Sequence, residues 1–182
     1  PRRPRRHSDA DPDRIGGGAL ALEVDRLAWA VAKRGKRMAS AKPTPVWKNE
    51  PDKHDYPAAA NYLSLIADKS LVQHLVKQLK KAPIVTYQAK DLLRASRLEL
   101  LPATDFHVRA DLIKIVAGVR LSPVLLVRGS VELGLPTTIA DGYHRVCASY
   151  HVADDTAIPA RIVDLPRALK RLAIDLDSGK KS

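Results

Sequence analysis

A succession of short apolar segments in the second half of the chain limits the possible folds more than any other feature of the sequence. The run VLLV follows Pro123, a β-branched stretch ends at Ala140, and the segment IPARIV closes the series. Such runs have the length of buried strands, and segments with helical apolar spacing lie between them. Strands that alternate with helices predict an α+β (α/β) domain.

The elements of this domain can be placed approximately from periodicity and turn residues. Strands are expected over residues 84–87, 123–127, 137–140 and 158–163, and helices over residues 91–96, 109–119 and 143–151. The central helix is expected to turn four apolar side chains inward, namely Leu112, Ile115, Val116 and Val119.

Residues 46–81, which precede this domain, predict a helical hairpin. Asp55 or Tyr56 can start the first helix with Pro57 at its first position, and residues 69–81 keep their apolar side chains on one face. Trp47 and Tyr56 are expected to be the large packing groups of the hairpin.

The two ends of the chain have a different composition. Residues 1–45 are rich in Arg, Pro, Gly and Ala and predict a disordered or partly helical basic tail. Because Met38 is the only methionine and an ordinary sequence follows it, we expect residues 1–37 to be an upstream extension. Residues 166–182 predict an amphipathic helix and a tail.

The balance of charge favours polyanionic partners. The chain has 31 Lys and Arg against 20 Asp and Glu, a formal net charge of +11. Such a charge suits nucleotides, nucleic acid or acidic protein surfaces. Residues 1–37 hold ten Lys and Arg and five Asp and Glu, so their net charge of +5 makes the tail the expected contact for nucleic acid.

Two further features concern the compartment. The only cysteine, Cys147, excludes an internal disulfide and suits a reducing compartment, so we expect a cytoplasmic protein. No apolar run approaches the ~18 residues of a membrane span, so no membrane partner is expected.

The stretch TIADGYHRVCASYHV carries the densest chemistry of the sequence. It predicts a strand that ends near Asp141, a glycine, and a helix that begins at Tyr143. A helix start exposes unpaired backbone N–H groups at the positive end of the helix dipole, which is a favourable seat for phosphate. Gly142 allows close approach of the backbone, and His144 and Arg145 in the first turn could contact the same anion.

Asp141 is unusual beside a phosphate unless it binds magnesium or accepts a proton from an incoming hydroxyl group. It could instead cap the helix. His144, Cys147 and His151 share one helical face with a spacing that would also suit zinc, although Cys147 fits a small core position as well and we expect no zinc site on this face. Asp105 and His107 could join the same site from the preceding loop.

The ordered segments SPVLLVRG, TTIADGYHRVCASYHV and AIPARIV resemble the superfamily of ParB N-terminal domains and sulfiredoxins. The resemblance covers residues 82–165, and its most specific part is Asp141 to Arg145 together with Ile158-Pro159-Ala160. It implies a small domain with a mixed sheet that binds a nucleotide. It also implies a basic side chain near the start of the 109–119 helix, either Arg109 or Lys114, that reaches the nucleotide.

Within this superfamily the local motif is most similar to the Asp-Gly-His-His-Arg motif of free-serine kinases. That likeness implies a catalytic role for Asp141 and phosphate contacts for His144 and Arg145, with Glu99 as a candidate for a further acidic residue. Tyr143 stands where sulfiredoxins have their reactive cysteine, so sulfinic acid reduction is not expected. Partitioning ParB proteins bind cytidine triphosphate, which adds CTP to ATP and ADP as candidate nucleotides.

Two functional hypotheses follow. In the first, the protein is a nucleotide-dependent phosphotransferase or nucleotide hydrolase, with Asp141 and His144 as catalytic residues and magnesium as a candidate cofactor. Gly142, Tyr143, His144, Arg145 and Arg109 would bind the phosphates. In the second, it is a nucleotide-responsive module that binds DNA or a protein without turnover, through the basic tail and the helical hairpin.

Overall fold

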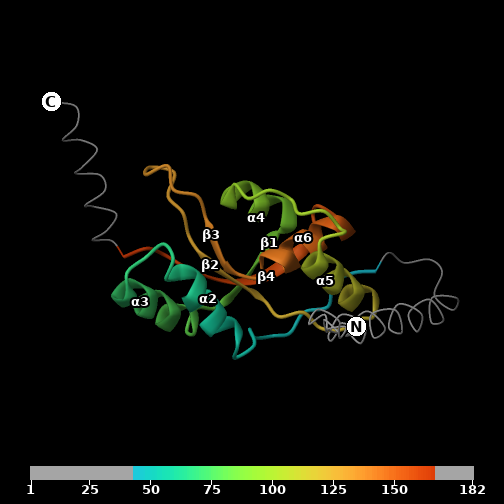
Figure 1. The fold of residues 1–182 in the computed structure, drawn as a ribbon, viewed down its shortest axis with the longest axis horizontal. Coiled ribbons are helices and arrows are strands. Elements are labelled where there is room, and N and C mark those ends of the chain that lie inside the picture. Colours follow the sequence, from blue (N-terminus) through green and yellow to red (C-terminus); the bar gives the residue numbers. More distant parts are fainter. Residues whose placement is uncertain (1–42, 167–182) are drawn as a thin grey trace, which may run out of the picture. The chain divides into compact units, whose positions relative to one another are not determined.

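A computed structural model describes residues 43–166 of the chain. The predictions for the basic tail and for the C-terminal helix fall almost entirely outside these residues. The described part is an α+β domain with a four-stranded mixed sheet, which confirms the predicted fold class (Figure 1).

The sheet has the strand order β1-β4-β2-β3. The last strand in the sequence, β4, therefore lies inside the sheet, antiparallel to β1 and parallel to β2. β3 pairs with β2 in the antiparallel sense and forms one edge. The strands span β1 (Ile84–Gln88), β2 (Val124–Val127), β3 (Thr138–Asp141) and β4 (Ala157–Val163).

Two helices occupy the segment for which a hairpin was expected, α2 (Asp55–Leu63) and α3 (Lys69–Leu79). Pro57 is the third residue of α2 rather than the first. The Asp68 side chain caps α3 by accepting hydrogen bonds from two backbone N–H groups.

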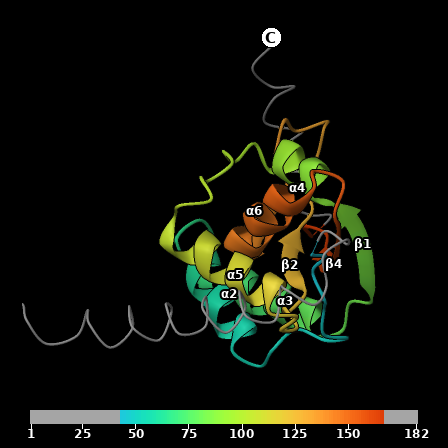
Figure 2. The same cartoon turned by 90° about the vertical axis from the view of Figure 1, so that its right-hand side faces the viewer.

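Three helices follow, α4 (Ala89–Ser96), α5 (Phe106–Val116) and α6 (Tyr143–Val152), and Figure 2 shows them together beside the sheet. The predicted start of α5 is wrong by three residues, because the Asp105 side chain caps the helix earlier than the apolar pattern suggests. The inward face is corrected as well: Val108 and Ile115 are buried, whereas Val116 and Val119 are each 50% exposed.

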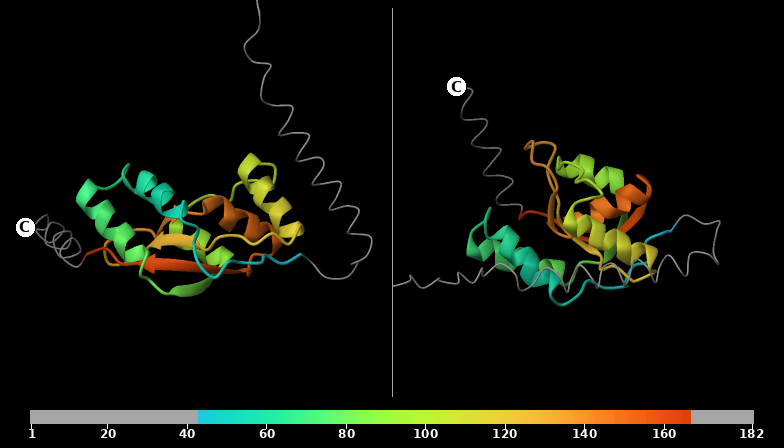
Figure 3. Two further views of the ribbon diagram at one scale, coloured as in Figure 1. Left: turned by 90° about the horizontal axis from the view of Figure 1, so that it is seen from below. Right: turned by 45° about the vertical axis from the view of Figure 1, so that its right-hand side comes forward.

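Alternate residues of the strands enter two separate cores. Val124 and Leu126 of β2 pack with α4, α5 and α6, while Leu125 and Val127 pack with α2 and α3. This alternation follows from the two-residue period of a strand and places helices on both faces of the sheet (Figure 3). Trp47 packs against the core of α4, α5 and α6, not against the hairpin that it was expected to anchor.

Within residues 43–166, none of the helices has the length and apolar character needed to cross a membrane.

Candidate functional site

The joint at Gly142 has the predicted form, since β3 ends at Asp141 and α6 begins at Tyr143. Gly142 has a φ of 99°, in the left-handed region. A Cβ atom at this position would lie 2.6 Å from Val124 Cγ1 and 2.9 Å from Arg145 Nη2. Both the backbone angle and the lack of space therefore require glycine here.

The first turn of α6 has no side-chain cap. Its first helical hydrogen bond runs from the Val146 N–H to the Gly142 carbonyl oxygen at 3.1 Å. Gly142 occupies the N-cap position, so capping is not the role of Asp141. The N–H groups of the first three residues are left for another acceptor, in contrast to α3 and α5, where an aspartate side chain accepts from two N–H groups.

Arg145 is held by two carboxylates. Its Nη2 donates to Asp141 at the end of β3, and its Nη1 lies 3.4 Å from Oδ1 of Asp55 at the start of α2. The Arg145 side chain is only 15% exposed, and it folds back over Gly142. In this structure Arg145 connects α6 to β3 and α2, rather than pointing to an open phosphate position.

Asp55 is the centre of a buried hydrogen-bond network. It is 1% exposed, and its Oδ2 accepts from the Ser122 hydroxyl group and from the Asp52 backbone N–H at 2.9 Å. The Ser122 oxygen also accepts from the Asp52 N–H, at 2.9 Å. These contacts fix the carboxylate that faces Arg145, because each oxygen of Asp55 has a partner.

The carboxylates and the guanidinium group form one electrostatic unit. Burial raises the pKa of Asp141 above its usual range; the Arg145 guanidinium opposes this shift, and the Asp55 carboxylate adds to it. With both carboxylates ionised the unit has one excess negative charge, and His54, whose Nε2 lies 3.4 Å from Asp55 Oδ1, offsets it when protonated. A proton or a cation is therefore favoured near Asp141.

His144 points to a different partner. Its ring contacts that of His107, the second residue of α5, with the ring centroids 4.7 Å apart. The starts of α5 and α6 thus lie close together, each with a histidine in its first turn. The structure brings His144 together with His107, and Arg145 together with Asp141, but within residues 43–166 His144 and Arg145 have no partner in common.

The hydroxyl group of Tyr143 is already engaged by the segment that follows α4. Its hydroxyl group donates to the backbone carbonyl of Glu99, and burial is the main cause that raises its pKa. Tyr143 is thus available to an anion through its backbone N–H only. The Glu99 side chain is exposed and lines a cleft of about 400 Å³ beside α4, together with Arg97 and Tyr150.

The two candidates for a basic residue on α5 differ in position. Arg109 is exposed in the first turn and has no ion pair among the described residues. Lys114 lies five residues further along, about one and a half turns, and pairs with Asp111 at 2.7 Å. The geometry favours Arg109, because it is closer to the start of α5 and its charge is not already paired.

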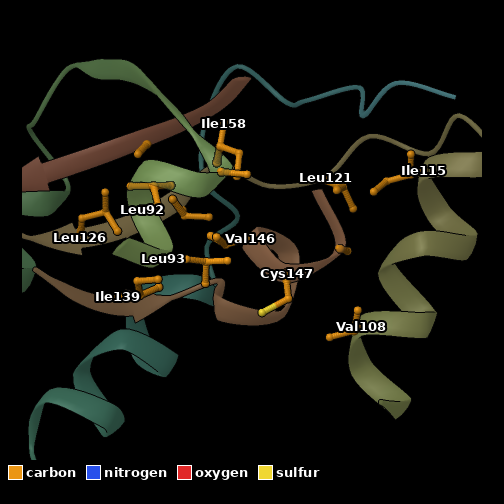
Figure 4. Packing of buried hydrophobic residues seen from close by; sticks show 14 residues of the cluster. Leu92, Leu93, Val108, Ile115, Leu121, Leu126, Ile139, Val146, Cys147 and Ile158 are labelled. Atoms are coloured by element: carbon orange, nitrogen blue, oxygen red, sulfur yellow. The ribbon is translucent and has the colours of Figure 1, made fainter. Parts of the chain in front are cut away.

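The zinc alternative finds no structural support. Cys147 is completely buried in the hydrophobic core, as Figure 4 shows, and burial raises the pKa of its thiol. His151 Nε2 lies 2.7 Å from the carbonyl oxygen of Leu101. Within residues 43–166 no group of three His, Cys, Asp or Glu side chains is placed to hold a metal ion.

Sequence reasoning missed Asp55 and Ser122 as parts of the site. Asp55 looks like an ordinary residue of a helix start, and it lies 90 residues from Arg145 in the sequence.

Sequence reasoning also missed Arg161 in the segment IPARIV. This buried side chain pairs with Glu50 and donates to the Lys80 carbonyl at 2.7 Å, so it stabilises the end of α3. No local pattern in the sequence marks these long-range pairs.

Comparisons of the chain with protein-family models, with curated proteins and with solved structures found no match. The candidate function therefore depends on the residues of the site.

Proposed function

We propose that the chain binds the phosphate groups of a nucleotide at the start of α6 and transfers or hydrolyses a phosphoryl group there. One observation carries the proposal: α6 begins at a left-handed glycine and has no side-chain cap. Its first N–H groups and the positive end of its dipole can therefore act on one anion. The resemblance to ParB N-terminal domains and sulfiredoxins is part of the same proposal.

The paired histidines supply further recognition. His107 and His144 stand at the starts of two helices with their ring centroids 4.7 Å apart, and an imidazole N–H group can donate a hydrogen bond to a phosphate oxygen. A phosphate group beside them would receive hydrogen bonds from side chains and backbone together. Arg109, in the first turn of α5, is the third candidate for this contact.

Asp141 and Arg145 have separate roles in the proposal. A carboxyl group whose pKa is raised by burial is better suited to accept a proton near neutral pH, so Asp141 is the candidate base. Arg145 positions Asp141 through their ion pair. Asp55, Asp141 and Arg145 together carry one excess negative charge, which would repel a bare phosphate. Magnesium is therefore the expected companion of the nucleotide.

Binding is tested by thermal unfolding of the full chain with ATP, ADP and CTP, with and without magnesium. A ligand at about 100 times its Kd stabilises the native state by about 2.7 kcal/mol. His144→Ala is expected to remove most of the shift, and His74→Ala, which changes an exposed histidine of α3, to retain it. The binding proposal fails if no nucleotide raises the melting temperature, or if the two variants respond equally.

Turnover is tested by phosphate release and by transfer to hydroxyl compounds. Asp141→Asn keeps the shape of the side chain and is expected to abolish turnover while nucleotide binding remains. The control is Asp91→Asn, which changes an aspartate paired with Arg94 on α4. Equal turnover in Asp141→Asn and in the parent protein would remove Asp141 from the mechanism.

A specific contact favours the second function, a nucleotide-responsive module without turnover. The Asp141 carboxylate already accepts from Arg145, so this contact must loosen before Asp141 can accept a proton from that side. Saturable nucleotide binding without any product would support the module, with DNA or a protein as the partner. Product formation that is proportional to enzyme concentration would exclude it.

A further inference from the structure

Helix α3 has an unusual distribution of charge. Four lysines lie between residues 69 and 81, and this segment contains no Asp or Glu. Asp68 stands just before it and is occupied with the N–H groups of Ser70 and Leu71. The basic residues of the segment, which we call the α3 lysines, are Lys69, Lys77, Lys80 and Lys81.

The α3 lysines face away from the sheet. Val72, Leu75 and Leu79 are buried on the opposite side of the helix, whereas all four lysines are exposed. Lys80 is the C-cap of α3 and Lys81 follows it, and their N–H groups still donate to the Val76 and Gln78 carbonyls. With helical geometry continued over these two residues, 100° and 1.5 Å per residue place the four lysines within an arc of about 120° and a length of about 18 Å. Figure 1 shows α3 on the side of the sheet opposite to α4 and α6.

The α3 lysines lack the ion pairs that most other cations of the domain have. Within the described residues, no carboxylate lies within 4.0 Å of any α3 lysine, and their one side-chain partner there is the Tyr56 ring, 5.6 Å from Lys80 Nζ. Elsewhere, each of the following side chains has a carboxylate partner: Lys48, Lys90, Arg94, Lys114, Arg128, Arg145 and Arg161.

A row of unpaired cations of this length fits a polymer of regularly spaced anions. Duplex DNA carries one phosphate charge per ~1.7 Å of its axis, so a helix of about 18 Å can meet several phosphates at once. Lysine contacts phosphate as a mobile point charge, without the geometry that reads bases. The expected contact is therefore independent of base sequence.

An anionic membrane fits the same surface less well. Leu65 and Ile66, in the turn before α3, are 79% and 60% exposed and could enter a lipid headgroup layer. Lys80 and Lys81 lie at the other end of the helix, about 18 Å from Lys69, whereas charges act over about 8 Å at physiological salt. The apolar turn and the full row of lysines therefore do not form one compact membrane-facing patch.

We propose that the α3 lysines bind the sugar-phosphate backbone of a nucleic acid without sequence specificity. This surface is separate from the start of α6, so the proposal does not depend on nucleotide binding there. The sequence suggested a contact with DNA through the tail and the helical hairpin; the present proposal assigns that contact to one face of one hairpin helix, within the folded domain.

The test measures binding of the full chain to a labelled DNA duplex of mixed sequence by fluorescence anisotropy, at several salt concentrations. The α3 variant is Lys69→Gln, Lys77→Gln and Lys81→Gln combined, which leaves Lys80 beside Tyr56. Each lysine that neutralises one phosphate contributes about 0.9 to the slope of log Kobs against log salt. The α3 variant is therefore expected to bind more weakly, with a slope that is less steep by about 2.7.

The matched control combines Lys90→Gln, Arg94→Gln and Arg128→Gln, which removes the same charge from cations that already have partners. It is expected to retain most of the parent's slope. Equal slopes in the two triple variants would overturn the proposal, because net charge alone would then explain binding. So would the absence of duplex binding, or binding only to phosphatidylserine vesicles.

Discussion

Replacement of Gly142 by alanine tests whether the joint between β3 and α6 is as tightly constrained as its geometry indicates. The new Cβ atom would lie 2.6 Å from Val124 Cγ1, and Val124 is completely buried in β2. It would also lie 2.9 Å from Arg145 Nη2, which can move only by disturbing its pair with Asp141. The φ of 99° adds backbone strain for any residue with a Cβ atom.

These two effects have separate magnitudes. A left-handed backbone costs an L-residue about 1–2 kcal/mol, and a methyl group forced into a packed site costs about 1–3 kcal/mol. We expect Gly142→Ala to lower the free energy of unfolding by about 3 kcal/mol, which moves a urea midpoint by about 1.5 M for an m-value near 2 kcal/mol/M.

The control for this variant is Gly118→Ala. Gly118 also has a positive φ, 69°, but a Cβ atom there would meet nothing within 4 Å. It therefore carries the backbone cost without the steric cost, and we expect a loss of about 1 kcal/mol. Urea unfolding of both variants, followed by circular dichroism, separates the two terms. If Gly142→Ala costs no more than Gly118→Ala, the argument from close packing at the joint is refuted.

Three further predictions concern the charged unit and the core. Arg145→Met leaves two carboxylates, Asp55 and Asp141, without their shared cation and should lower the free energy of unfolding in urea by about 3 kcal/mol. The control Arg128→Met, at an exposed ion pair, should lower it by under about 1 kcal/mol. Equal losses in the two variants would contradict a buried role for Arg145. The pKa of Asp141 is raised on folding, so protonation of this carboxyl group favours the native state. Its contribution to the free energy of unfolding is complete below the pKa of Asp141 in the unfolded chain, near 3.8, and disappears as the pH rises through its pKa in the folded protein. The parent should therefore gain stability relative to Asp141→Asn as the pH falls through that window, and parallel pH profiles would refute this. Cys147, buried and with a raised pKa, should resist thiol reagents in the native protein and react after unfolding, and rapid native labelling would contradict its placement.

The sequence predicted the elements around the joint because their signals are local. The run VLLV, the glycine after Asp141 and the helical spacing that follows are properties of neighbouring residues, and the structure has β2, β3 and α6 within one or two residues of the expected bounds. The predicted start of α5 was three residues too late because it was taken from the apolar pattern alone. The Asp105 side chain caps the helix before that pattern begins, so the helix starts at Phe106.

The partners of the charged side chains could not be predicted in this way. Arg145 and Asp55 are brought together only when α2 packs beside β3, and no spacing rule connects residues so far apart. The sequence placed His144 and Arg145 on one anion because both lie in the first turn of a helix. Adjacent residues of a helix point about 100° apart, however, and here one meets α5 and the other meets α2.

The position of β4 has a consequence for how the domain can form during synthesis. β4 is made last of the four strands, yet it inserts between β1 and β2, which have no other contact with each other in the sheet. Until residue 163 has left the ribosome, β1 remains without a neighbour and β2 has only β3 beside it. Folding must therefore wait for the closing strand, and a nascent chain arrested before it should expose unpaired strand edges to chaperones or to other chains.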